Sequence, residues 1–394
     1  MHESTDGATA PPSVPLVDLG AAHAGLRPEL DAAVAEVVAS GAFVHGPQVA
    51  AFEAAFALAC GTARAVGVAS GTAALHLALR AVGAGPGDQV VTTPLTFAAT
   101  AEAIGHAGAQ ARFVDVEDAT GGIDPKAAAA ALAEPSGRRT AAVLPVHLYG
   151  LPVDMAELGP AAAEHGVPVV EDAAQAHLAT VTLPGGAERL AGGLGAAAAF
   201  SFYPGKNLGA FGDAGAVTTD DEAIAERVAR LRDHGRASGR LAKYEHAEEG
   251  WGERLDTVQA AVLLVKLARL AAGNAARERV AARYDAALAG LGDLRLPARP
   301  AGRVSAWHLY VVRTGEREAL LAHLRARRIQ AGVHYPVPLH LQPAWHRLGH
   351  ARGDFPAAEA WADQCLSLPL YPELPAAAQD RVVDAVRGFF EGDR

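Results

Sequence analysis

The 394-residue sequence is poor in cysteine and has no long apolar run and no cluster of basic residues. Its two cysteines, Cys60 and Cys365, lie far apart and form no CxxC pair. This excludes a disulfide framework and a thiolate metal site, and it fits a reducing cytoplasm. The formal net charge of −10 and the lack of aromatic–basic interleaving argue against a nucleic-acid partner. No apolar stretch reaches membrane-spanning length, so we expect no membrane partner.

Lysine is the rarest basic residue: only four lysines occur, and nearly every other cationic position is arginine. One of them, Lys206, lies between two glycine-rich turns in FSFYPGKNLGAFGDAGAV (200–217). An amine can lose its proton and form a Schiff base, which a guanidinium cannot do. Lys206 is therefore the candidate reactive residue, and an ordinary exposed loop lysine is the alternative.

Short apolar runs alternate with amphipathic stretches over the first two thirds of the chain. We predict strands at 64–70, 88–94, 111–116, 140–150, 167–173, 196–202 and 214–220, with helices between most of them. This alternation predicts an α/β fold in which helices cover both faces of a mostly parallel sheet.

The pattern changes after Asp256, where a long helical stretch (256–288) precedes a smaller C-terminal α+β domain. Residues 1–13 lack the charged and apolar regions of a signal peptide and are predicted to be a short disordered leader. We therefore expect a large domain over 14–265, and a linking helix with a small domain over 266–394.

Ligands of such sheets bind beyond the carboxyl ends of the strands, so residues that follow predicted strands are the site candidates. Gly71 and Thr72 open a helix, and the free N–H groups of a first helical turn attract phosphate. Ser201, at the end of another strand, is placed to reach the same phosphate. An ordinary helix cap explains the first feature equally well.

Asp172 closes an apolar strand, where its carboxylate is placed to pair with a ring nitrogen and keep a pyridine protonated. A helix cap or a metal ligand is the alternative, but no cluster with metal-ligand spacing accompanies it, and we expect no metal. Phe97 follows a further strand, where its ring is placed to stack on a flat cofactor, although a core phenylalanine is commoner. The glycines around Lys206 lack GxGxxG spacing, which argues against a dinucleotide.

Together these elements supply a phosphate cradle, a pyridine partner, a stacking ring and a Schiff-base lysine, which are the groups that pyridoxal 5′-phosphate needs. The motifs SGTAALHLAL, TFAATAEAI, PVHLYG, EDAAQAH, SFYPGKNLGAFGDAGAV, RLDTVQAAVL and VHYPVPLHLQPAW span nearly the whole chain. In these motifs the sequence closely resembles the DegT/StrS-type family of pyridoxal phosphate-dependent sugar aminotransferases, which have the fold type I, aspartate aminotransferase-like architecture.

The resemblance implies a role for each matching residue. Lys206 would carry the cofactor and act as catalytic acid and base, Asp172 would pair with the ring nitrogen, and Gln175 would contact the phenolic oxygen. The implied phosphate ligands are Gly71, Thr72 and Ser201, and the implied stacking ring is Phe97. Substrate contacts are expected, with less support, from His147, Tyr149, His334, Tyr335 and His340, each of which is equally explained as a packing residue.

Two stretches depart from the family pattern. Gly252 stands where the family usually has an asparagine that reaches the phosphate of the neighbouring subunit, so that contact is lost or is replaced by Arg254 or water. Leu178 stands where the family usually has glycine, and a longer segment, 180–195, follows it and is placed to reshape the sugar pocket.

The resemblance implies a homodimer with shared sites that moves an amino group from glutamate or glutamine to a keto-sugar in amino-sugar biosynthesis. The acceptor we expect is a nucleotide-linked keto-deoxyhexose. Alternatives are a cyclitol (inosose) aminotransferase, a dehydratase or epimerase with the same cofactor, and a non-catalytic regulator that kept the fold.

Overall fold

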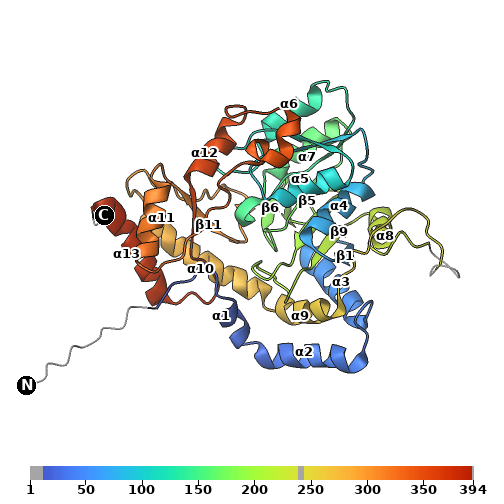
Figure 1. The fold of residues 1–394 in the computed structure, drawn as a ribbon, viewed down its shortest axis with the longest axis horizontal. Coiled ribbons are helices and arrows are strands. Elements are labelled where there is room, and N and C mark those ends of the chain that lie inside the picture. Colours follow the sequence, from blue (N-terminus) through green and yellow to red (C-terminus); the bar gives the residue numbers. More distant parts are fainter. Residues whose placement is uncertain (1–11, 238–243, 393–394) are drawn as a thin grey trace, which may run out of the picture.

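The computed structural model describes residues 12–237 and 244–392 of the chain, which fold around one central sheet (Figure 1). The sheet strands are β1 (Arg64–Val68), β2 (Gln89–Thr92), β3 (Gln110–Phe113), β4 (Thr140–Val143), β5 (Val170–Asp172), β8 (Ala197–Ser201) and β9 (Gly215–Thr219). They form two hydrogen-bonded groups, β3-β2-β4 and β5-β8-β9-β1. Parallel bridges from Val143 to Val169 and from Val146 to Asp172 join the groups. Only β9 runs antiparallel to its neighbours, so the predicted, mostly parallel sheet is confirmed.

Helices cover both faces of this sheet, as the sequence predicts. They are α3 (Pro47–Cys60), α4 (Gly71–Ala81), α5 (Ala98–His106), α6 (Pro125–Ala133), α7 (Met155–Glu164), α8 (Glu222–Leu231) and α9 (Thr257–Leu267). Alternate residues of a strand face opposite cores. In β8, Ala197 and Ala199 belong to the core that holds α4, α5 and α8, whereas Ala198 and Phe200 belong to the core with α3 and α9. Both faces of the sheet are buried, and this explains why its strands are apolar at nearly every position.

The C-terminal part builds a second core around the antiparallel pair β11 (Tyr310–Arg313) and β12 (Cys365–Leu368). Its helices are α10 (Leu270–Leu288), α11 (Arg317–Ala326), α12 (Pro356–Gln364) and α13 (Ala376–Glu391), with short 3-10 turns η2 (Leu339–Leu341) and η3 (Pro343–Leu348). The helices α1 (Leu19–Ala24) and α2 (Arg27–Ser40) lie along the edge of the molecule near α9 (Figure 1).

The N-terminal segment is tied to this second core. Val14 is buried there, and its N–H donates to the carbonyl of Arg328 at 2.9 Å. The Ser13 hydroxyl donates to the same carbonyl at 3.2 Å. The predicted leader thus ends earlier than residue 13, and its residues 1–11 lie outside the described residues.

Two predicted elements are shorter than expected. The strand predicted over 140–150 ends at Val143, because Pro145 cannot donate a ladder hydrogen bond, and a 3-10 turn, η1 (Leu148–Gly150), follows. The helical stretch predicted over 256–288 is two helices, α9 and α10, which meet at 60°. The bend lets α9 bury Leu263 in the large core and α10 bury Tyr284 in the second core.

Among the described residues, no single helix is long and apolar enough to cross a membrane, and only the bent pair α9–α10 passes that test by length and composition.

Phe56 of α3 provides a test of the large core. It is fully buried, and its ring lies 5.0 Å from the rings of both Phe200 and Phe202. Phe56→Ala should lower the free energy of unfolding by about 3–5 kcal/mol, because it removes the ring and leaves a cavity. Phe56→Leu, which keeps most of the volume, should cost less than half as much in the same urea titration. Equal losses would show that the ring contacts, not the filled volume, matter here.

Candidate active site

A cavity of about 640 Å³ opens at the carboxyl ends of the central strands. The helix starts contribute Ser70, Gly71 and Thr72 of α4 and Phe97 and Thr100 of α5. Asp172 ends β5 and Ser201 ends β8, and Gln175 and Lys206 lie in the turns that follow these strands. The C-terminal part contributes His308, His334 and Tyr335. All seven cofactor candidates of the sequence analysis lie in this one cavity. They come together because parallel strands deliver their carboxyl ends to one edge.

Lys206 lies in the turn after β8, where its backbone N–H donates to the Tyr203 carbonyl at 2.8 Å. Burial lowers the pKa of Lys206 to about 8, and the nearby Asp172 charge acts in the opposite direction. A fraction of the lysine is therefore an uncharged amine near neutral pH, which is the form that attacks a carbonyl.

Asp172 ends β5 and is fixed by two donors. Its Oδ2 accepts from the Thr100 hydroxyl at 2.8 Å, and its Oδ1 accepts from the Ala174 N–H at 3.2 Å. Burial raises the pKa of Asp172, while these hydrogen bonds and the charge of Lys206 lower it. A buried carboxylate of this kind is stabilised by a cation, and a protonated pyridine nitrogen is such a cation.

The start of α4 offers free backbone donors. Ser70 caps the helix by accepting from the Ala73 N–H at 3.1 Å, which leaves the N–H groups of Gly71 and Thr72 without partners in the described part of the chain. A Cβ at position 71 would lie 2.5 Å from the Cβ of Ser201, so glycine lets the Ser201 hydroxyl approach this helix end. The combination of helix start and hydroxyls suits a phosphate.

Gln175 has a fixed orientation. Its Oε1 accepts from the Tyr149 N–H at 2.6 Å, so its Nε2 is the donor that faces the cavity, and it lies 3.4 Å from the Tyr335 hydroxyl. Phe97 is 56% exposed, and its ring centre lies 5.7 Å from that of Tyr335. An amide donor and an open aromatic face suit a planar phenolic ligand.

The substrate candidates divide into two groups. His334 and Tyr335 line the cavity, whereas His147, Tyr149 and His340 do not. Tyr149 is buried and donates its hydroxyl to the His334 carbonyl, so it supports the cavity wall from behind.

His147 and His340 are buried beside carboxylates. His147 Nε2 lies 3.0 Å from Glu171, and its Nδ1 accepts from the Val153 N–H at 3.1 Å. His340 Nε2 lies 3.0 Å from Glu359. The packing that buries these two residues and Tyr149 separates them from the cavity lining, so the structure gives the expected substrate contacts no support, and they stay predictions.

The departing stretches also lie away from the cavity. Leu178 has φ = 59°, in the left-handed region that favours glycine. The segment after it forms the hairpin β6 (Thr180–Thr182) and β7 (Glu188–Leu190), which pairs with β10 (Arg303–Val304). Within the described residues this hairpin does not line the cavity, and its effect on the sugar pocket stays a prediction.

The stretch around Gly252 likewise lies outside this chain's own cavity. Arg254 is ion-paired with Asp233 at 2.7 Å, and a Cβ at Gly252 would lie 3.3 Å from the His234 ring. What replaces the usual asparagine contact stays a prediction.

Sequence reasoning missed Thr100 and His308. Thr100 holds Asp172 from a helix 72 residues earlier in the chain. His308 lies just before β11 of the second core, and only the tertiary fold brings it to the cavity. The only available signal for His308 was a polar residue within the otherwise apolar run WHLYVV.

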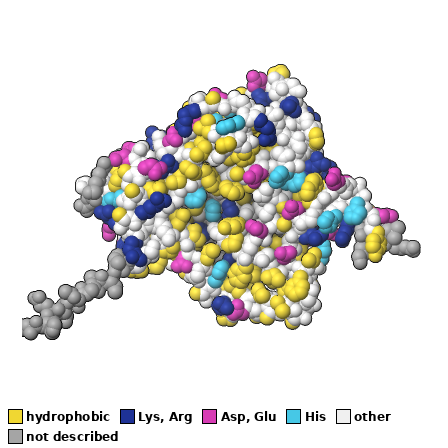
Figure 2. All heavy atoms as spheres, in the orientation of Figure 1, with side chains coloured by type: hydrophobic (Ala, Val, Ile, Leu, Met, Phe, Trp, Pro, Cys, Tyr) yellow, Lys and Arg dark blue, Asp and Glu magenta, His cyan; other side chains and the backbone are white. Residues whose placement is uncertain are grey.

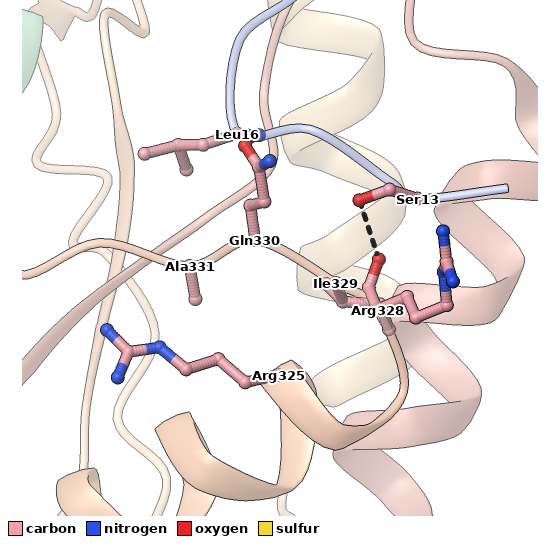
Figure 3. Close-up of a pocket in the computed structure, with 7 residues that line it drawn as sticks. All are labelled: Ser13, Leu16, Arg325, Arg328, Ile329, Gln330 and Ala331. Atoms are coloured by element: carbon pink, nitrogen blue, oxygen red, sulfur yellow. Dashed lines mark hydrogen bonds between the residues drawn. The ribbon is translucent and has the colours of Figure 1, made fainter.

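A second hollow, of about 510 Å³, lies between the N-terminal segment and the end of α11 (Figure 3). It is lined by Ser13, Leu16, Arg325, Arg328, Ile329, Gln330 and Ala331. Its two arginine side chains are exposed and point in different directions, so they do not converge on one ligand atom. It holds none of the predicted site residues.

The residues of the first cavity fit pyridoxal phosphate on their own chemistry. They offer a half-buried amine for its aldehyde, a buried carboxylate for its ring nitrogen, an amide donor for its phenolic oxygen and a helix start for its phosphate. The described residues contain no group of three or more His, Cys, Asp or Glu placed to hold a metal ion.

Comparison with known proteins agrees with this geometry. The model of the DegT/DnrJ/EryC1/StrS aminotransferase family matches residues 25–387. The chain belongs to this family. It is a pyridoxal phosphate-dependent aminotransferase with the architecture that its motifs predict.

Among the relatives of this aminotransferase is the dTDP-3-amino-3,4,6-trideoxy-alpha-D-glucose transaminase of Streptomyces venezuelae, 46% identical over 96% of this chain and 97% of the relative. Another is the erythromycin biosynthesis sensory transduction protein EryC1 of Saccharopolyspora erythraea, 44% identical over 95% of this chain and 99% of the relative. The crystal structure of S. venezuelae DesV with a ketimine intermediate has a TM-score of 0.91 at 46% identity and covers 97% of this chain and 99% of that chain.

The pKa of Lys206 predicts how the aminotransferase takes up its cofactor. Only the uncharged amine reacts with an aldehyde, so covalent loading of cofactor-free protein with pyridoxal phosphate should speed up as pH rises, with a midpoint near 8. Stopped-flow absorbance at a series of pH values measures this rate. A midpoint near 10.5, the ordinary value for lysine, would contradict the effect of burial.

Asp172→Asn should lower the activity of the enzyme and raise the melting temperature of the cofactor-free protein. Burial raises the pKa of Asp172 in the folded protein above its value in the unfolded chain. The cofactor-free fold therefore loses stability as pH rises through the folded-state pKa and the carboxyl group ionises. The neutral amide removes this cost, so cofactor-free Asp172→Asn protein should melt above wild type at pH 8. Its activity should fall about 100-fold or more, since the buried ion pair with the ring nitrogen is lost. A lower melting temperature together with full activity would contradict both assignments.

Proposed function

We propose that this aminotransferase transfers an amino group from glutamate, or glutamine, to a nucleotide-linked keto-deoxyhexose and so makes an amino-sugar. The observation that carries the proposal is the pair of half-buried Lys206 and buried Asp172, which face one cavity from the ends of adjacent strands. The sugar class is supported by the name of the S. venezuelae relative, a dTDP-amino-sugar transaminase that shares nearly the full length of the chain.

When bound, pyridoxal phosphate withdraws electrons from a substrate carbon through its protonated ring, which makes the proton on that carbon removable. Asp172 keeps the ring nitrogen protonated by placing its negative charge in a buried site. Thr100 and the Ala174 N–H hold the two carboxylate oxygens and so orient that charge. Gly71, Thr72 and Ser201 hold the phosphate, Gln175 donates to the phenolic oxygen, and Phe97 covers one face of the ring.

Lys206 then moves the proton. Its Nζ amine would accept the proton from the α-carbon of the amino donor and hold it for return within the cavity. Burial suits this role, because a pKa of about 8 lets Nζ both take and give a proton near neutral pH. The same residue repeats the steps in reverse when the keto-sugar accepts the amino group. Proton transfer by a positioned group contributes roughly 10²–10⁴-fold to the rate.

His334 and Tyr335 are the sugar-facing candidates. Both line the cavity, the Tyr335 ring lies 5.7 Å from that of Phe97, and His334 Nδ1 lies 2.8 Å from the Ser367 hydroxyl, which fixes the imidazole ring. A polar histidine and a phenol beside an aromatic ring suit a hydroxylated ring of small size.

A homodimer with shared sites is part of the same proposal. Lys206 is the only lysine or arginine among the residues that line the cavity in the described chain, although a phosphate and a nucleotide both carry negative charge. Large apolar side chains are exposed at the cavity mouth and beside it: Phe97, Tyr203 and Phe211. On the face shown in Figure 2, hydrophobic side chains also gather over the region of α9 and α2. A second subunit would cover this surface.

The function is tested with a panel of nucleotide keto-sugars and inososes, each offered with glutamate and with glutamine, with products identified by mass. Wild-type enzyme should give an amino-sugar and the matching 2-oxo acid, whereas Lys206→Ala should give neither, because no amine remains to move the proton. Lys126→Ala, which removes an exposed lysine at the start of α6, is the matched control and should keep full activity.

The same panel separates the alternatives. Conversion of an inosose alone would favour a cyclitol aminotransferase. Dehydrated or epimerised sugar without a 2-oxo acid would favour the other cofactor-dependent reactions. Colourless protein that takes up no cofactor would favour a non-catalytic regulator, the reading that the name of EryC1 brings to mind.

A further inference from the structure

Three histidines surround the reactive lysine. Burial is the main cause that lowers the pKa of His177, His308 and His334, and the Lys206 charge lowers each further. Only His308 and His334 line the cavity. His177 donates from Nε2 to the Ser201 carbonyl at 3.1 Å, and its Nδ1 is buried. It therefore offers nothing to the cavity.

His308 differs because a chain of amide groups fixes its protonation. Asn274 Nδ2 donates to the His177 carbonyl at 2.7 Å, so Asn274 Oδ1 must be the atom that accepts from Asn207 Nδ2 at 2.9 Å. Asn207 Nδ2 also donates to the Ala306 carbonyl at 2.7 Å. Carbonyl oxygens only accept, so both amides are held in one orientation.

The orientation of Asn207 decides the tautomer of His308. With its amide nitrogen committed twice, Asn207 presents Oδ1 to His308 Nδ1 at 3.2 Å. An oxygen acceptor requires a proton on Nδ1, and a neutral imidazole then has a bare lone pair on Nε2. In the described part of the chain Nε2 has no hydrogen-bond partner, and His308 shares the cavity with Lys206.

We propose that His308 is a positioning residue for Lys206: its Nε2 accepts an N–H of the lysine amine whenever that amine is not bonded to the cofactor. The hydrogen bond would hold the amine with its lone pair toward the substrate carbon between proton transfers. No bond is made or broken at His308, because it stays neutral throughout. The expected change in kcat rests on the proposed function, whereas the expected tautomer of His308 does not.

The surroundings keep His308 neutral. The charged and titratable groups that act on it are Lys206, Arg277, His177 and His334, and all of them lower its pKa, as burial does. A neutral His308 keeps the lone pair of Nε2 available as an acceptor. A cationic histidine would instead repel the ammonium form of Lys206 and leave it no acceptor.

The tautomer is tested directly on cofactor-free protein. Long-range ¹⁵N–¹H NMR of histidine-labelled enzyme, with His308 assigned by its loss in His308→Asn, should show a protonated Nδ1 and a bare Nε2 from pH 6 to 9. A proton on Nε2, or a doubly protonated ring, would overturn the proposal. This readout needs no substrate, so it stands even if the proposed acceptor sugar is wrong.

Two variants of His308 distinguish its role as a hydrogen-bond acceptor from a role in packing alone. In His308→Asn, the amide nitrogen replaces Nδ1 and keeps the contact with Asn207, but the acceptor in the cavity is lost. We expect kcat for the glutamate half-reaction to fall about 2- to 10-fold, the effect of losing one hydrogen bond between uncharged groups, with KM within about twofold of wild type. His308→Gln, which can place its Oε1 near the position of Nε2, should recover part of the lost rate.

His346→Asn, the same change at an exposed histidine, is the control and should behave as wild type. The proposal is overturned if His308→Asn keeps the wild-type kcat, or if both His308 variants lose rate and melting temperature together without rescue by glutamine. Wild-type enzyme that is inactive with every donor would instead refute the proposed function and leave the NMR result to decide on His308.

Discussion

Two charges of opposite sign in one cavity, half-buried Lys206 and buried Asp172, set the main constraint on how this protein is built. Each is costly to bury alone: burial lowers the pKa of the lysine and raises that of the carboxyl group. The fold tolerates both because they share one cavity and because Asp172 is held by Thr100 and a backbone N–H. The same desolvation that costs stability makes the amine reactive and gives the carboxylate a strong effect on a ring nitrogen.

The cavity is assembled from separate layers of the protein. Strand ends supply Asp172 and Ser201, helix starts supply Gly71, Thr72 and Phe97, and the C-terminal part supplies His308, His334 and Tyr335. Hydrogen bonds from residues outside the cavity fix the orientation of the side chains that line it. Tyr149 orients Gln175, and the Asn274–Asn207 amide chain orients His308. Substitutions behind the cavity wall therefore change the chemistry without touching a ligand.

The sheet and the cofactor residues were predictable from local signals. Apolar runs bounded by glycine and short polar turns locate β1, β2, β8 and β9, and the scarcity of lysine draws attention to Lys206. Proximity in a motif did not predict which substrate candidates line the cavity. His147 and Tyr149 lie in one motif, and both are buried outside the cavity lining, because a residue just past a strand end can turn to either side of the sheet.

By itself the sequence determined the class of fold, the family and seven residues that the structure brings to one cavity, because these depend on periodicity and on residue types that no other side chain replaces. Only the tertiary structure decided which histidines face the cavity, where the long helical stretch bends and which way each amide points. Those features depend on contacts between segments about 20 to 185 residues apart, such as His340 with Glu359, Asn207 with His308 and Tyr149 with His334. Local patterns of charge and hydrophobicity carry no information on such pairings.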